Sequence, residues 1–197
     1  VLVSLLALTL SFLRTDSAWA LWPERGPAPT SRWCQWVFRV QVAAVYFWAG
    51  VAKLNPDWLG RGEPLYTWLQ AYHHWPLVGE FLATRPAALA MSWGGAIFDL
   101  TIWAWLLWPA TRCPAYVVAV GFHVIVWMMF PIGIFPWVML SAATLLCAPD
   151  WPRRFLRRGR SHVRIVSPLT SPKMIVVGGW VMVQVLVPAR SLLYEGP

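Results

Sequence analysis

Long apolar stretches, separated by short segments rich in proline, glycine and charge, dominate the sequence. A helix needs ~20 residues to cross a bilayer. Apolar stretches cover residues 33–54, 87–108, 115–130, 137–147 and 174–187; the first two reach that length and the others are shorter. Residues 1–13 are also apolar but too short to span alone, and we interpret them as the end of a further helix. The pattern predicts an all-α, polytopic transmembrane bundle of about five to six segments, with residues 1–197 forming part of one membrane domain.

Proline and glycine interrupt this pattern at two places. Residues 55–86 form an amphipathic connection punctuated near its start, and residues 65–72 within it are predicted to form a short helix. The second interruption, PIGIFP at 131–136, predicts a broken helix pair near residues 130–137. Such a break is tolerated at membrane depth only where protein or a water-filled cavity covers the freed backbone groups.

Composition agrees with a membrane protein. Hydrophobic residues make up 58% of the chain and charged residues 12%, whereas a soluble domain carries about twice that charged fraction. The 16 tryptophans suit anchoring at two membrane–water interfaces. The composition therefore favours an integral, multi-pass membrane protein whose main partner is lipid.

The net charge of +8 could indicate nucleic acid binding, but its distribution gives another explanation. Lysine and arginine concentrate in residues 14–32, 109–114 and 150–173. By the positive-inside rule these segments face the cytoplasm, and the arginine-rich loop 150–173 can also contact anionic lipid. No nucleic acid partner is expected. The connection 55–86 then falls on the non-cytoplasmic side.

The cysteines and histidines do not form a metal-binding pattern. Cys34, Cys113 and Cys147 are widely spaced near predicted cytoplasmic ends, so free thiols are expected. His73 and His74 have no third ligand at a useful spacing. The sequence also lacks a phosphate-binding glycine loop and a nucleophile elbow. We therefore expect no metal site.

Ionisable residues in membrane spans usually face a protein interior or a cavity. Lys53 ends the stretch 33–54. Its stem either extends to the lipid headgroups or holds the amine in a dry pocket, where an amine can act as a base. Asp99 and His123 lie mid-span, where they either form structural hydrogen bonds between helices or line a site.

Several gapped motifs resemble one known family. Residues 46–58, YFWAGVAKLNPDW, resemble the Y-F-x-A-G-V-x-K-L-x-x-D-W segment of vitamin K-dependent gamma-glutamyl carboxylases, whose shared membrane region is called the HTTM domain. Phe122-His123, followed by FPIGIFPWVML at 130–140, is similar to F-H-x(6)-L-F-x-I-G-x-F-P-W-x-M. Shorter matches occur at 99–100, 147–154 and 188–190, so the resemblance covers essentially the whole chain in order.

The resemblance implies a reaction and a base. Lys53 matches the family's catalytic base, which deprotonates vitamin K hydroquinone or a related quinol. Oxygen then converts the quinol to an epoxide and generates a strong base. That base removes the γ-proton of a glutamate side chain, and carbon dioxide adds to the carbanion. A dry site is required, because only without water does such a base survive.

The same resemblance suggests further site residues. Asn55, Asp57 and Trp58 would shape the mouth behind Lys53, while Asp99 and His123 would hold helices or line the site. Phe130, Phe135 and Trp137 would wall an apolar quinone pocket, and Arg190 would lie at the start of the next lumenal segment. Glutamate-containing peptides are the implied protein substrate, and no metal is implied.

Two parts of the family pattern are expected outside this sequence. An Asn-His pair should lie just before Val1, and the large lumenal portion that holds the propeptide should follow Pro197, so we interpret the chain as an internal piece of a longer protein. Residues 124–129 also lack an asparagine that the family often carries. Two alternatives stay open: an enzyme that oxidises a quinol or another lipid without carboxylating peptides, and a non-enzymatic protein that binds quinone or lipid.

Overall fold

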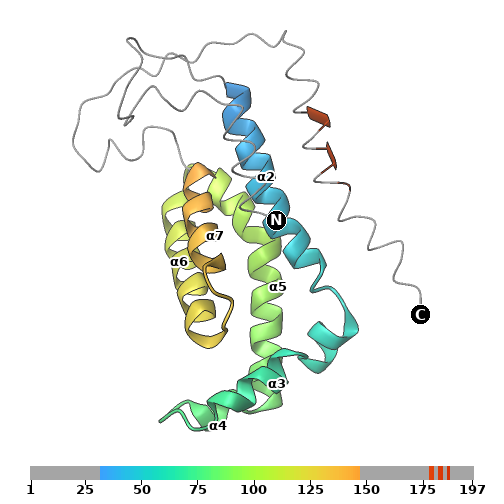
Figure 1. Ribbon diagram of the computed structural model, residues 1–197, viewed down its shortest axis with the longest axis vertical. Helices are drawn as coiled ribbons and strands as arrows, with labels where there is room; N and C mark the ends of the chain where they lie inside the picture. The colour runs from blue at the N-terminus through green and yellow to red at the C-terminus, as the bar shows by residue number, and fades with distance from the viewer. Residues whose placement is uncertain (1–31, 147–177, 180–181, 184–185, 187–197) are drawn as a thin grey trace, which may run out of the picture. The chain divides into compact units, whose positions relative to one another are not determined.

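The computed structural model describes residues 32–146, 178–179, 182–183 and 186 (Figure 1). Within these residues the chain is helical and contains no strand. The elements, in chain order, are α2 (Arg32–Val51), the π-helical turn η1 (Asp57–Arg61), α3 (Leu65–Leu69), the 3₁₀ turn η2 (Gln70–Tyr72), α4 (Gly79–Leu82), α5 (Arg85–Leu107), α6 (Arg112–Met129), α7 (Phe135–Ala143) and the 3₁₀ turn η3 (Thr144–Leu146). The predicted all-α class is confirmed for this part of the chain.

Two of these helices, α5 and α6, are long and apolar enough to cross a membrane. They correspond to the predicted spans 87–108 and 115–130. The apolar parts of α2 and α7–η3, Trp36–Val51 and Phe135–Leu146, are shorter. The total of five to six segments stays a prediction. The stretch 1–13 and most of the span 174–187 lie outside the described residues.

The chain divides into two compact units. We call residues 43–105 the first unit and residues 1–42 together with residues 106–197 the second unit. In the first unit, the C-terminal part of α2 runs antiparallel to α5 (Figure 1). Gly50 allows the two helices to approach closely, because a β-carbon there would lie 2.7 Å from Leu100 Cγ and 2.9 Å from the Leu100 backbone nitrogen. Small residues permit such close approach between membrane helices. Tyr46 and Phe98 add an edge-to-face ring contact with centroids 6.0 Å apart.

The connection between α2 and α5 is tied to the first half of α5. Trp58 Nε1 donates to Ser92 O at 3.0 Å, Trp93 Nε1 donates to Leu59 O at 3.1 Å, and Arg85 Nη1 donates to Arg61 O at 3.0 Å. The short helix predicted at 65–72 is confirmed as α3 continued by η2. The turns η1 and α4 were not predicted.

In the second unit, α6 and α7 pack side by side (Figure 1). Helix α6 ends where Phe130 turns extended, Gly133 adopts a positive φ of 62°, and Pro136 lies in the first turn of α7. Glycine favours that left-handed backbone and proline suits the start of a helix. The predicted broken pair is therefore confirmed. Trp127 and Trp137 make an edge-to-face contact across the break between α6 and α7, with ring centroids 5.6 Å apart.

Arg112 closes the end of α5 by donating to the carbonyls of Leu106 and Leu107, both at 2.9 Å. Basic side chains commonly satisfy the last carbonyls of a helix in this way. The neighbouring Cys113 is exposed and free, as expected. The side chains of Cys34 and Cys147 lie outside the described residues.

Candidate functional site

Lys53 follows the last turn of α2 and directs its ammonium toward α5. Its Nζ donates to Asp99 Oδ2 at 2.6 Å and to Ala49 O at 3.1 Å. The backbone helps to place it, since Lys53 N donates to Gly50 O at 3.0 Å and tightens the end of the helix. The side chain therefore reaches the neighbouring helix rather than extending away from it to the lipid headgroups.

Asp99 lies in the middle of α5 and is buried. Of the two paired side chains, Lys53 is 21% exposed and Asp99 is 9% exposed. Removing a charge from water costs several kcal/mol unless a partner and further hydrogen bonds compensate for it. Lys53 supplies that partner for Asp99. The carboxylate thus forms a hydrogen bond between helices, which is one of the two roles that its mid-span position indicates.

The indole of Trp58 covers the lysine. Lys53 Nζ lies 5.3 Å from the centroid of that ring, a distance at which a cation is attracted to an aromatic face. The ring is held in place by its bond to Ser92 O. Asn55 fixes the backbone leading to it, because Asn55 Oδ1 accepts from Trp58 N and Asn55 Nδ2 donates to Ala52 O, both at 2.9 Å.

We call Lys53, Asp99, Trp58 and Asn55 the Lys53 cluster. Asp57, also expected here, is exposed and pairs instead with Arg61 one helical turn away, at 3.0 Å. The cluster can therefore hold one ionisable pair between two helices, with an aromatic ring over the nitrogen.

The other expected site residues belong to the second unit or lie beyond the described residues. His123 is buried in α6, where its ring packs against Phe122 with centroids 5.4 Å apart. Phe130 is half-buried, whereas Phe135 and Trp137 are exposed. Arg190 lies outside the described residues. The structure thus groups three of the expected residues, Asn55, Trp58 and Asp99, around Lys53. The structure describes His123, Phe130, Phe135 and Trp137 within the second unit.

Two buried polar atoms of the first unit were not predicted from the sequence. Trp48 Nε1 and Ser92 Oγ have no hydrogen-bond partner among the described residues. Ser92 is fully buried two turns before Asp99, so both point from a similar face of α5. A polar residue seven positions from a buried charge on an apolar helix is a signal that could have identified it. Each atom can donate a hydrogen bond.

Chemically, the Lys53 cluster can hold a proton in two places. With the proton on Lys53 Nζ the pair is an ammonium and a carboxylate, and with the proton on Asp99 Oδ2 it is an amine and a carboxylic acid. Both forms carry no net charge, so exchanging them does not bury an additional charge. In the second form the lysine nitrogen has a free lone pair and can accept a proton.

The fold and the site together define a helical domain that has two helices long and apolar enough to cross a membrane and a lysine–carboxylate pair largely removed from solvent. Residues 1–151 match the family model of the HTTM domain. The chain belongs to the HTTM domain family, consistent with the membrane domain of the vitamin K-dependent carboxylase family. No solved structure matches the chain.

Proposed function

We propose that this membrane domain contributes the base for the oxygenation of a quinol, vitamin K hydroquinone or a related molecule, and that this reaction drives carboxylation of glutamate side chains. The observation that carries the proposal is the Lys53–Asp99 pair, whose Nζ–Oδ2 distance is 2.6 Å and which is largely removed from solvent, within the residues that match the HTTM domain. A base-initiated reaction requires a side chain that can accept a proton at a position shielded from water, and the amine of Lys53 is such a group.

Residues of the first unit offer groups that a planar molecule with ring hydroxyl groups could use. Trp58 offers an aromatic face beside Lys53 Nζ. Trp48 Nε1 and Ser92 Oγ are buried donors whose hydrogen-bonding capacity is unused among the described residues, and such groups gain stability when a partner arrives. The quinol, once bound, supplies the oxygen chemistry and the strong base derived from it.

The role of the chain in that reaction is to hold and move one proton. Asp99 Oδ2 takes the proton from Lys53 Nζ, and the freed amine then accepts a proton from the quinol hydroxyl. The pair gains one positive charge while the quinol gains one negative charge, so the site as a whole stays neutral. The Trp58 ring limits the access of water to Lys53, which protects a strongly basic species from quenching.

Oxygen and carbon dioxide are the proposed co-substrates, and a glutamate-containing peptide is the proposed acceptor. The support for this half of the reaction is family membership. We further propose a multi-pass arrangement of five to six segments, with Lys53 and the connection 55–86 on the non-cytoplasmic side and the loop 150–173 in the cytoplasm. The charge distribution supports this arrangement.

The test uses the full-length protein in lipid nanodiscs, supplied with vitamin K hydroquinone, oxygen, labelled bicarbonate and a glutamate-containing peptide. Epoxide and carboxylated peptide are measured separately. Lys53→Ala should lower both rates by about 10²–10⁴-fold, the usual contribution of a general base. Epoxide formation at the wild-type rate in that variant would overturn the role assigned to Lys53.

Lys53→Arg is the matched control variant. Arginine keeps the positive charge beside Asp99 but does not lose its proton in proteins. A base at position 53 therefore predicts a folded and inactive protein. Epoxide without carboxylated peptide in the wild type would favour an enzyme that oxidises a quinol or another lipid alone.

One observation favours a second, non-enzymatic candidate. The ion pair with Asp99 and the bond to Ala49 O satisfy Lys53 without any ligand. In that case the domain would bind quinone or lipid, and the pair would serve to join α2 to α5. Full retention of quinone binding in Lys53→Arg, with no epoxide formed by the wild type, would support this candidate.

A further inference from the structure

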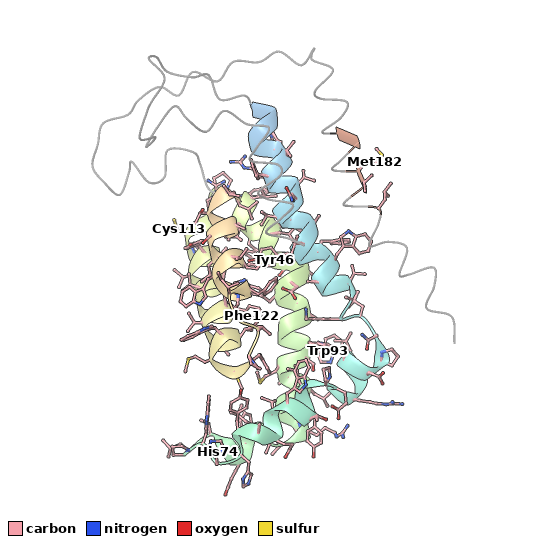
Figure 2. All side chains as sticks on the ribbon, viewed as in Figure 1. Tyr46, His74, Trp93, Cys113, Phe122 and Met182 are labelled. Carbon is pink, nitrogen blue, oxygen red and sulfur yellow. The ribbon has the colours of Figure 1, made fainter. Side chains whose placement is uncertain are left out.

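The connection preceding α5 carries a surface that the Lys53 cluster does not use. We call residues 64–84, which include α3, η2 and α4, the arm. The arm lies at the N-terminal end of α5, with His74 toward its outer part (Figures 1 and 2). Helix α3 buries Leu65 and Leu69 and leaves Trp68 exposed. The arm is thus anchored on one side and open on the other.

The open side of the arm is apolar at its tip. Leu77 is fully exposed, at 103% of its reference area, and the next turn exposes Phe81 at 64% and Val78 at 46%. Glu80 is the only charged residue of the arm, counting Asp, Glu, Lys and Arg. Isolated exposed apolar residues are ordinary on a protein surface, whereas a contiguous group marks a place of interaction.

The backbone of the arm holds this tip outward. Leu77 has a positive φ of 71°, which is unfavourable for a residue with a side chain as large as leucine. The turn before α4 is tight, because Gly79 N donates to Trp75 O at 3.0 Å and a β-carbon at Gly79 would lie 2.2 Å from His73 O. The exposure of Leu77 is therefore built into a defined turn. A strained residue held in this way indicates a functional role.

Charged groups gather at the base of the arm instead. Arg85 lies 4.0 Å from Glu63, stacks over Tyr66 with its guanidinium 4.5 Å from the ring centroid, and donates to Arg61 O. The arm thus has a charged base, aromatic residues between, and an apolar tip in which Glu80 is the one carboxylate. Segments that lie in the boundary between lipid headgroups and acyl chains combine Trp, Phe and Leu in this manner.

We propose that the arm inserts its tip, Leu77, Val78 and Phe81, into the headgroup–acyl boundary of the leaflet at which α5 enters the membrane. Connectivity supports this occupant, since the arm leads directly into α5 at Arg85 and α5 is long and apolar enough to cross the bilayer. The apolar tip thereby lies only a few residues before the start of α5. The inference does not depend on the reaction proposed for Lys53.

Site-specific fluorescence in the full-length protein tests the insertion. All native cysteines are replaced by serine, and one cysteine is placed at Leu77 or, as a second probe, at Phe81. The matched control is Gly60→Cys, because Gly60 is exposed in η1 of the same connection and a β-carbon there meets open space. Each variant carries an environment-sensitive dye in phosphatidylcholine vesicles.

Insertion predicts that the dye at 77 and at 81 emits at shorter wavelength than the dye at 60. Spin-labelled lipid should quench it severalfold more, and aqueous iodide severalfold less. Iodide quenching equal to that at Gly60 would overturn the proposal, because the tip would then face water. Blue-shifted emission that spin-labelled lipid does not quench would also overturn it, because a second copy or another part of the full-length chain would then cover the tip.

Discussion

Lys53 Nζ lies 2.6 Å from Asp99 Oδ2, and this contact joins the end of α2 to the middle of α5. The two residues are separated by 46 positions in the sequence. Gly50 makes the contact possible one turn earlier, since its lack of a side chain lets the helices approach. The ion pair of Lys53 with Asp99 therefore depends on the small size of Gly50. Any proton transfer at Lys53 involves a nitrogen that is hydrogen-bonded to a carboxylate.

Breaking the pair from one side should destabilise the domain more than removing it altogether. Asp99→Leu or Lys53→Met alone leaves one ionisable group without its partner, and we expect a loss of about 2–3 kcal/mol in the free energy of unfolding. This lies below the full penalty of a completely buried pair because Lys53 keeps some exposure. The double variant should recover most of that loss. Unfolding by SDS in mixed micelles measures all three, and simple additivity of the single losses would contradict a coupled pair.

The close approach at Gly50 gives a second prediction. Gly50→Ala adds a β-carbon 2.7 Å from Leu100 Cγ, and such overpacking should cost about 1–3 kcal/mol. The same substitution at Gly94 is the control, because that glycine lies in α5 and a β-carbon there meets nothing within 4 Å. Gly94→Ala should be neutral or slightly stabilising, by up to about 1 kcal/mol. If both variants unfold at the same SDS concentration, the helices do not meet at Gly50.

The helices of the described region could be read from the sequence because their signals are local. Residues 87–108 and 115–130 are long apolar runs, and they form α5 and α6 within a few residues of the expected ends. The break between α6 and α7 was equally clear, since Gly133 and Pro136 each constrain the backbone on their own. Local composition therefore predicts these elements, irrespective of how they pack.

The Lys53 cluster shows what local signals leave out. Lys53 and Asp99 each stood out as a charge in an apolar span, but their pairing depends on the register of two helices, which is set by Gly50 against Leu100. The role of Asn55 likewise depends on backbone geometry, because its side chain joins Ala52 O to Trp58 N. The tip of the arm at Leu77 depends on a turn conformation that leucine rarely adopts.

Asn55 gives a third prediction. Asn55→Ala removes both hydrogen bonds that connect the end of α2 to η1 and should cost about 1–2 kcal/mol. Asn55→Asp keeps the acceptor for Trp58 N but loses the donor to Ala52 O, so its loss should be about half as large. Asp57→Asn, on the exposed side of η1, should change stability by less than about 1 kcal/mol. Equal losses in Asn55→Ala and Asp57→Asn would mean that Asn55 does not hold this junction.

The sidedness of α5 gives the last prediction. If α5 crosses the membrane, residues before and after it must lie on opposite sides, and the orientation proposed above from the charge distribution has the later residues in the cytoplasm. Cys113 is exposed and free in the first turn of α6, so it can react with a membrane-impermeant maleimide. We expect it to be labelled in inside-out vesicles and protected in intact cells, with Cys34 and Cys147 replaced by serine. A cysteine at Gly60 with Cys113 also replaced, where a new side chain meets open space, should show the reverse pattern. Labelling of both positions from one side would contradict a transmembrane α5, and reversal of the two patterns would contradict only the proposed orientation.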